Sequence, residues 1–167
     1  MEIRREAAAD CERVRAVVQE AFGRDDEARL VARLRRCEGV LSLVAVEGGI
    51  VVGHAMFSPV TVVPRAVVAR GLAPVAVAVA HQRRGVGARL IEHGIAALRK
   101  EGVALVVVLG HPDYYARFGF VPAAPLGLHC KWGRQEGAFR VRELVAGSLA
   151  KVHGRVEYLA TFDESAW

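Results

Sequence analysis

Hydrophobic and polar residues change from extended to helical spacing near the start of the chain. Residues 3–6 alternate like a short edge strand. Apolar residues then recur at helical spacing over 10–22 and again over 27–36, with Asp10 as the predicted N-cap of the first helix and Gly23 as its stop. The arginines of the second helix are expected on its solvated face. The chain is therefore predicted to begin with an edge strand and two amphipathic helices.

A β-hairpin is predicted next, with strands over 41–46 and 50–63 joined by a glycine-rich turn. Pro59 cannot donate to a strand ladder, so the second half of the long strand is predicted to be an edge, bulged or bent at Ser58. His54 and Ser58 are four residues apart and are expected on one face of this strand. They are candidates to line a pocket, and a core position is the alternative for His54.

The middle of the chain predicts a strand, a helix and a second strand. Residues 62–71 have the pattern of a turn, and 75–79 that of a strand. A helix is predicted over 85–101, ending at a glycine. The seven apolar residues of 103–109 are typical of a fully buried strand. Two buried strands joined by a helix indicate a parallel crossover unit.

Short elements are expected in the remainder. Pro112 is predicted in the first turn of a helix of one or two turns that Gly119 terminates. Strands are predicted from Phe120, over 139–145 and over 156–159. Mixed strands and helices in this order predict the α+β class.

Composition narrows the class of protein. The chain has 167 residues, 53% of them hydrophobic, which suits one domain with a sizeable core. Its net charge is +5, with the arginines scattered among acidic residues, and this disfavours a nucleic-acid partner. The three cysteines, Cys11, Cys37 and Cys130, have no metal-ligand spacing, so no metal is expected. Neither a signal-peptide pattern nor a long apolar run occurs, and a cytoplasmic protein without a membrane partner is expected.

The stretch Val75–Ala88, VAVAVAHQRRGVGA, carries the first candidate chemistry. A strand, a tight turn and a helix in this order form one kind of backbone anion site, because the first helical N–H groups have no internal partner. Gly85 and Gly87 allow a sharp turn and close approach of an anion, while Arg83 and Arg84 add positive charge. The alternative is an ordinary strand-to-helix turn.

Two motifs in succession favour the anion site over the ordinary strand-to-helix turn. Gln82-Arg83-Arg84-Gly85-Val86-Gly87 resembles the acetyl-CoA signature Q/R-x-x-G-x-G/A of the GNAT superfamily of N-acetyltransferases. The run from Tyr115 to Phe120 resembles the Y-x-x-x-G-F element of the same family. Together with the strand order, the resemblance covers about residues 1–125. It implies a strongly twisted mixed sheet of six to seven strands, flanked by about four helices and splayed between two parallel strands.

The resemblance implies which residues hold the donor. Pyrophosphate is expected on the N–H groups from Arg83 to Ala88, and pantetheine along the main chain of the preceding strand. The expected cofactor-binding residues are Val75, Ala76, Val77, Gln82, Arg83, Arg84, Gly85, Val86, Gly87 and Ala88.

Catalytic residues follow from the second motif. Tyr115 matches the position of the family's general acid to the CoA thiolate, although Tyr114 is a rival and a packed aromatic is the alternative role. Many members carry a glutamate as base, but 103–109 contains no ionisable residue. The base is therefore open: relayed water, His111, His54, or none if the amine has a low pKa.

The resulting hypothesis is a single-domain N-acetyltransferase over 1–167 that acts on a primary amine of a small molecule or peptide. Its core is expected over about 1–125, and the acceptor walls in the first two helices, around Ser58 and in 126–167. His129, Lys131 and Trp132 are candidates for a rim of that site, with a surface loop as the alternative. The resemblance also makes a homodimer a candidate assembly, since strand-rich C-termini in this family often join dimers. The competing hypothesis is a catalytically silent CoA-binding sensor.

Overall fold

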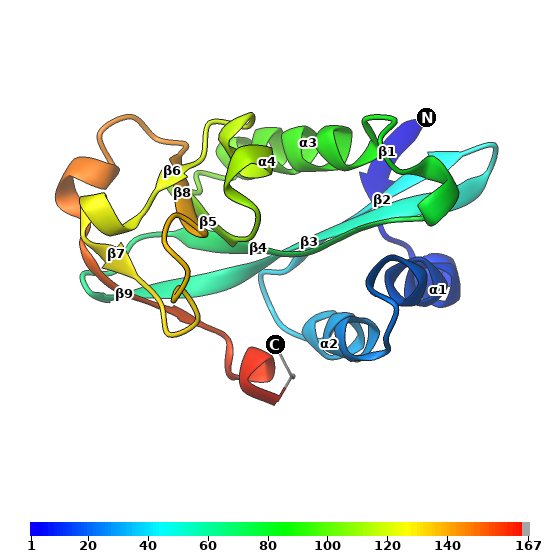
Figure 1. Cartoon of the computed structure of the whole chain (residues 1–167), viewed down its shortest axis with the longest axis horizontal. Helices are drawn as coiled ribbons and strands as arrows, with labels where there is room; N and C mark the ends of the chain where they lie inside the picture. Colours follow the sequence, from blue (N-terminus) through cyan, green and yellow to red (C-terminus); the bar gives the residue numbers. More distant parts are fainter. Residues whose placement is uncertain (165–167) are drawn as a thin grey trace. The chain divides into compact units, whose positions relative to one another are not determined.

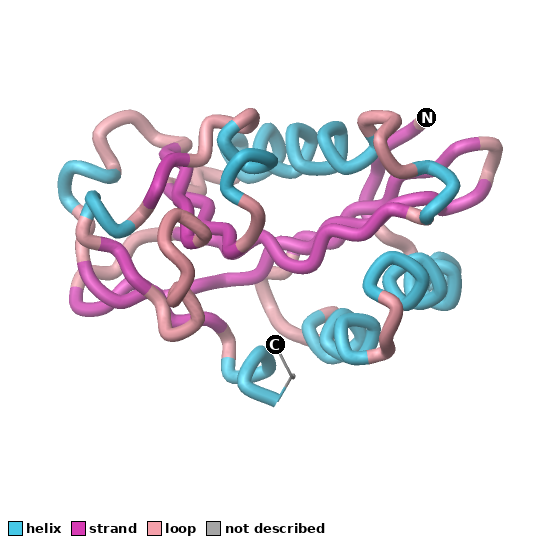
Figure 2. The backbone as a smooth tube through the Cα atoms, viewed as in Figure 1, coloured by secondary structure: helices cyan, strands magenta, loops and turns pink. Residues whose placement is uncertain are grey.

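The computed structural model describes residues 1–164 of the chain, which form a mixed α/β fold (Figures 1 and 2). The helices are α1 (Cys11–Phe22), α2 (Asp26–Leu34), α3 (Val86–Lys100) and α4 (Pro112–Ala116). The strands are β1 (Glu2–Arg5), β2 (Leu41–Glu47), β3 (Ile50–Pro64), β4 (Ala69–Val77), β5 (Leu105–Leu109), β6 (Val121–Pro122), β7 (Leu128–His129), β8 (Phe139–Glu143) and β9 (Gly154–Tyr158). Short 3₁₀ turns lie at Ala8–Asp10, Val79–His81, Ala124–Leu126, Leu149–Lys151 and Ala160–Glu164.

Nine strands pair within the described residues, in the order β1-β2-β3-β4-β5-β8-β6, with β9 on β3 and β7 on β9. The expected mixed fold is confirmed, with more strands than the six or seven predicted, because β6 and β7 are two-residue strands that hydrophobic patterning does not detect. No helix in residues 1–164 is long and apolar enough to cross a membrane.

The chain divides into two compact units, each built from separate segments of sequence. Unit 1 comprises residues 1–57, 74–94 and the C-terminal segment from Ala160, and unit 2 comprises 58–73 and 95–159. Strands β3 and β4 and helix α3 each pass from one unit to the other. The expected single domain therefore stays a prediction.

Unit 1 is an antiparallel sheet between helices. β1 pairs with β2, and β2 with the first half of β3, in the predicted hairpin. Figure 1 shows α1 and α2 on one face of these strands and α3 on the other. Gly53 of β3 lets α3 come close, since a Cβ there would lie 2.8 Å from Val86 and 3.0 Å from Leu90.

The two predicted N-terminal helices are confirmed, but the role of Asp10 is different. Asp10 makes no side-chain cap bond to α1. Its carboxylate instead accepts from the backbone N–H of Ala7 and from Arg4, both at 2.7 Å. Gly23 ends α1 as expected, at φ +69° with its N–H bonded to Gln19.

The prediction that the second half of β3 is an edge was wrong. β3 pairs with β2 up to Phe57 and with β9 from Val60, so Ser58 and Pro59 lie where the strand changes partner. A proline fits there because it has no N–H to donate. The bulge of the hairpin is on β2, between Ala45 and Val46.

Unit 2 contains the parallel pair. Residues Ala69–Leu72 of β4 pair in parallel with Leu105–Val108 of β5, as the crossover pattern predicts. β5 also pairs antiparallel with β8, which keeps the apolar strand buried on both edges. The prediction that 62–71 is a turn was wrong at both ends, since β3 runs to Pro64 and β4 begins at Ala69.

Candidate functional site

Residues 78–88, which we call the phosphate turn, follow β4 in unit 1 and lead into α3. β4 ends at Val77, earlier than predicted, and Val79 lies in a 3₁₀ turn. Arg83 adopts φ +60° and Gly85 φ +81°, so two left-handed residues reverse the chain before α3. Gly85 has nothing within 4 Å of an added Cβ, and the chain there is open to solvent.

A row of unused backbone donors lies at the start of α3. The first ladder bond is donated by the N–H of Arg89 to the carbonyl of Gly85 at 3.0 Å. Before it, the N–H groups from Arg83 to Ala88 have no acceptor in the described part of the chain. Unpaired N–H groups at a helix N-terminus attract anions. The turn therefore fits a phosphate group through main-chain atoms.

Side chains hold this turn in place. The Gln82 amide donates to the carbonyl of Val77 at 3.0 Å, which joins the end of β4 to the turn. The N–H of Val79 donates to the Glu20 carboxylate of α1 at 3.0 Å. Arg84 pairs with Glu47 at 3.7 Å. Gln82 and Arg84, both expected to bind the cofactor, thus have partners of their own within the chain.

The strand before the turn alternates in exposure. Val75 and Val77 are half-buried, whereas Ala76 and Ala78 are buried. Ala78 donates its N–H to Val52 at 2.9 Å. Side chains along this segment are apolar, so a ligand lying on it would be held by main-chain groups.

Tyr115 lies on α4 of unit 2, in an aromatic and glycine-lined environment. Its ring is edge-on to Phe120, with centroids 5.9 Å apart. A Cβ on Gly110 would lie 2.5 Å from the ring, so only glycine leaves this ring room at that position. Burial raises the pKa of Tyr115, and the nearby Tyr114 raises it further. The Tyr115 hydroxyl is therefore protonated at neutral pH, and it makes no hydrogen bond to any residue within 1–164.

Tyr114 faces different neighbours. Its ring packs edge-on to Phe118 at 5.3 Å, and the Arg117 guanidinium lies 4.7 Å from the ring centroid. Burial raises the pKa of Tyr114, with Arg117 acting against that rise. The two tyrosines therefore differ in environment, although their rings lie edge-on with centroids 5.0 Å apart.

β8 holds the segment after α4. Arg140 is buried and donates to the carbonyl of Phe120 at 3.0 and 3.2 Å, and to that of Gly137 at 3.2 Å. Arg142 donates to the carbonyl of Phe118 at 2.6 Å. Two arginines on one face of β8 thus fix the chain that follows Tyr115. Nothing in the sequence motif points to them.

The two candidate basic histidines have opposite surroundings. His111 is exposed and precedes α4, where its carbonyl accepts the N–H of Tyr115 at 3.3 Å. His54 is fully buried in unit 1, with Nε2 at 2.8 Å from the Ser42 hydroxyl. Ser58 is also fully buried, so both predicted pocket residues of β3 are core positions.

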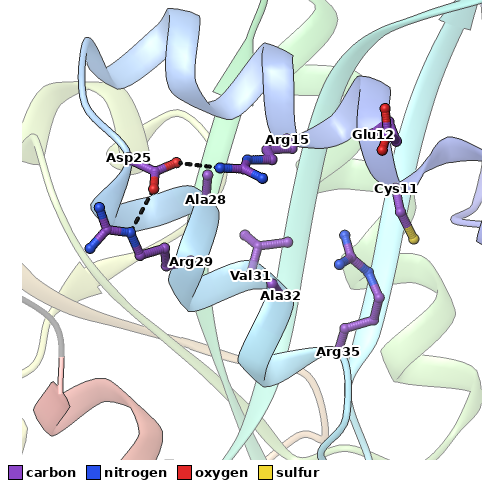
Figure 3. A pocket seen from close by; sticks show the side chains of 9 residues that line it. All are labelled: Cys11, Glu12, Arg15, Asp25, Ala28, Arg29, Val31, Ala32 and Arg35. Carbon is purple, nitrogen blue, oxygen red and sulfur yellow. Dashed lines mark hydrogen bonds and ion pairs between the residues drawn. The ribbon is translucent and has the colours of Figure 1, made fainter.

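A groove lies between α1 and α2 in unit 1, with a volume of about 470 Å³ (Figure 3). Asp25 joins its two sides, with its carboxylate 3.5 Å from Arg15 of α1 and 2.5 Å from Arg29 of α2. Arg35 also lines the groove and pairs with Glu6 at 2.6 Å. The arginines expected to be simply solvated are thus partly used in ion pairs.

The C-terminal loop is anchored in unit 2. Trp132 packs edge-on to Tyr158 at 5.4 Å, and the Lys131 ammonium lies 4.6 Å from the Trp132 ring centroid. His129 lines a separate pocket of about 360 Å³ together with Cys130 and Glu136. All three cysteines of the chain are free thiols. No group of metal-ligating side chains occurs between residues 1 and 164.

The family model for the acetyltransferase (GNAT) domain matches residues 2–123. The chain belongs to the GNAT acetyltransferase family. N-acetyltransferase YhbS of Escherichia coli K12 is 39% identical over 166 residues, which cover 98% of this chain and 99% of YhbS. YjhQ of the same strain is 43% identical over 121 residues, covering 70% of this chain and 67% of YjhQ.

Solved GNAT structures agree with this assignment. A crystal structure of Escherichia coli YhbS in complex with CoA has a TM-score of 0.91 at 39% identity, covering 97% of this chain and 91% of that one. A GNAT acetyltransferase from Brucella melitensis in complex with acetyl-CoA has a TM-score of 0.80 at 34% identity, covering 97% of each chain. The predicted family and the acetyltransferase class are confirmed, and these two relatives were crystallised with CoA and with the expected donor acetyl-CoA, respectively.

Proposed function

We propose that this GNAT acetyltransferase transfers an acetyl group from acetyl-CoA directly to a primary amine of a small molecule or peptide. The observation that carries the donor half is the row of unpaired N–H groups from Arg83 to Ala88. Relatives crystallised with CoA and acetyl-CoA support the same ligand for this turn. Val75, Ala76 and Val77 supply main-chain groups to the pantetheine, and the exposed guanidinium of Arg83 adds charge beside the phosphates.

Acetyl-CoA supplies the acetyl group and a thiolate leaving group that must take up a proton. Tyr115 donates that proton in this proposal. Its raised pKa keeps the hydroxyl protonated, and its ring is held by Gly110 and Phe120. In the balanced step, the neutral amine forms the new C–N bond as the C–S bond breaks. Tyr115 protonates the sulfur, and the proton lost by the amine passes to solvent, from which Tyr115 is reprotonated.

The solvent exposure of the two candidate histidines distinguishes them as possible bases. His54 is fully buried and already bonded to Ser42, and burial lowers its pKa to about 4. His111 is exposed and lies four residues before Tyr115. We therefore propose that the amine loses its proton to His111 or to water, and that His54 has a structural role.

The Tyr115→Phe variant tests the acid role. Thiol release from acetyl-CoA is followed with a panel of amines and a no-amine blank, which also corrects for the three free cysteines. We expect kcat to fall about 100-fold or more, since a positioned general acid contributes on the order of 10² to 10⁴. The Kd of CoA, measured by calorimetry, is expected to stay within about twofold because the phenol contacts only the sulfur.

Tyr114→Phe is the matched control, because it removes a neighbouring hydroxyl on the same helix. We expect it to retain kcat near that of the wild type. Wild-type turnover by Tyr115→Phe with any accepted amine would refute the acid role. Tight CoA binding without thiol release across a broad panel would favour the sensor hypothesis instead.

A further inference from the structure

Glu47 places a carboxylate against the side chains of the phosphate turn. It is the last residue of β2, and its Oε2 lies 3.2 Å from Nε2 of His81. Its Oε1 lies 3.7 Å from Nη2 of Arg84. All three side chains are partly exposed, at 40% for Glu47, 26% for His81 and 57% for Arg84. An acidic group thus stands at a site whose main chain favours anions.

The backbone of the turn does not depend on Glu47. Its conformation is held by Gln82 bonded to Val77 and by Val79 bonded to Glu20. Glu47 reaches only the side chains of His81 and Arg84. Its charge therefore acts on these two side chains and leaves the N–H row in place.

Two anions compete for the Arg84 guanidinium in this proposal, the Glu47 carboxylate and a phosphate bound at the turn. The Arg84 guanidinium pairs with Glu47, while the adjacent Arg83 has no partner in the described residues. A phosphate on the N–H row adds negative charge beside the Glu47 carboxylate, and like charges raise each other's energy. The Glu47 carboxylate attracts the Arg84 guanidinium and so weakens its interaction with the phosphate.

We propose that Glu47 competes with the CoA phosphates for Arg84 and thereby lowers the affinity of the turn for CoA. The proposal rests on the proposed use of this turn for CoA. Exposed ion pairs contribute about 0.2–1 kcal/mol, which corresponds to about a 1.4- to 5-fold change in Kd. Neutralising Glu47 therefore strengthens CoA binding within this range.

Calorimetric titration of CoA into Glu47→Gln, without acceptor, tests the proposal. We expect a Kd about two- to fivefold lower than that of the wild type. Glu38→Gln is the matched control, because Glu38 is exposed, makes no ion pair within residues 1–164 and undergoes the same charge change. It is expected to leave the Kd within about 1.5-fold.

A second pair of variants separates the Arg84 interaction from charge in general. In an Arg84→Met background, Glu47→Gln is expected to lower the logarithm of the Kd by less than half of the change that it causes in the wild-type background. An unchanged or higher Kd for Glu47→Gln would overturn the proposal, and so would an equal gain in the Arg84→Met background. A wild-type protein that fails to bind CoA would instead refute the donor half of the proposed function.

Discussion

The buried His54 makes the stability of the protein depend on pH below neutrality. Its side chain is fully buried, and burial lowers its pKa from the ordinary 6.5 to about 4. Glu6, 3.8 Å away, acts against this shift, and Arg35 acts with it. The folded protein therefore keeps His54 neutral at a pH where the unfolded chain protonates it.

The direction in which stability changes with pH follows from proton binding. Between pH 6.5 and 4 the unfolded chain binds a proton at His54 that the folded protein does not, so the free energy of unfolding falls as the pH falls. Since one pKa unit is worth about 1.36 kcal/mol, the difference between 6.5 and about 4 amounts to about 3 kcal/mol in all. About 1.3 kcal/mol of it is lost between pH 7.5 and 5.5.

The window above pH 5.5 isolates His54 from its neighbour Glu6. Burial by itself raises the pKa of Glu6, but hydrogen bonds from Arg35 and Ser42 outweigh it and hold the pKa below its usual value. A lowered carboxylate pKa means that stability is lost only as the pH falls below that ordinary value, near 4.5. The Glu6 contribution therefore lies outside the window.

His54→Gln removes the titrating group while keeping a polar side chain near Ser42. Urea unfolding at pH 7.5 and 5.5, extrapolated linearly, gives the free energy at each pH. We expect the wild type to lose about 1.3 kcal/mol more than the variant over this interval. His93→Gln, at an exposed position, shows how much any such substitution changes the profile. Equal losses in wild type and His54→Gln would refute the reasoning.

Two further substitutions test the packing of each unit. Gly94→Ala is expected to lower the free energy of unfolding by about 1 kcal/mol. The added methyl group would overlap with the buried Phe57 ring, and this cost outweighs the helix propensity gained. A variant that is more stable than the wild type in urea unfolding would contradict this. Arg140→Met is expected to lower the free energy of unfolding by about 2 kcal/mol, because it leaves the carbonyls of Phe120 and Gly137 without their donor. Thermal unfolding at the wild-type midpoint would contradict this. Arg140→Lys is the control that keeps the charge without the planar fork.

Helix ends and tight turns are predictable from the sequence because they depend on residues that are adjacent in the chain. The ends of α1 and α3 lie close to where the glycine stops predict them. Gly85 is left-handed in the turn before α3, in keeping with the predicted sharp turn, but the second left-handed residue is Arg83, and Gly87 lies within α3. Patterning was less successful where pairing partners decide the outcome. Pro59 indicated an edge, but the second half of β3 pairs with β9, nearly a hundred residues later in the chain.

The candidate site shows the same division. The N–H row of the phosphate turn is predictable because it depends on a strand, two glycines and a helix in immediate succession. The Glu47 contact to Arg84 and the Arg140 bonds to Phe120 had no signal in the motifs. Each joins segments that are far apart in sequence, so no local spacing records it.

By itself the sequence determined the family, and it predicted the backbone of the turn before α3 and the tyrosine motif at Tyr115, because these depend on short stretches of adjacent residues. Only the tertiary structure decided that His54 is a buried, neutral histidine and that Arg84 already has an anionic partner. Burial and charge pairing are properties of neighbours in space. The charge state of His54 and the pairing of Arg84 with Glu47 therefore follow from folding rather than from the motifs themselves.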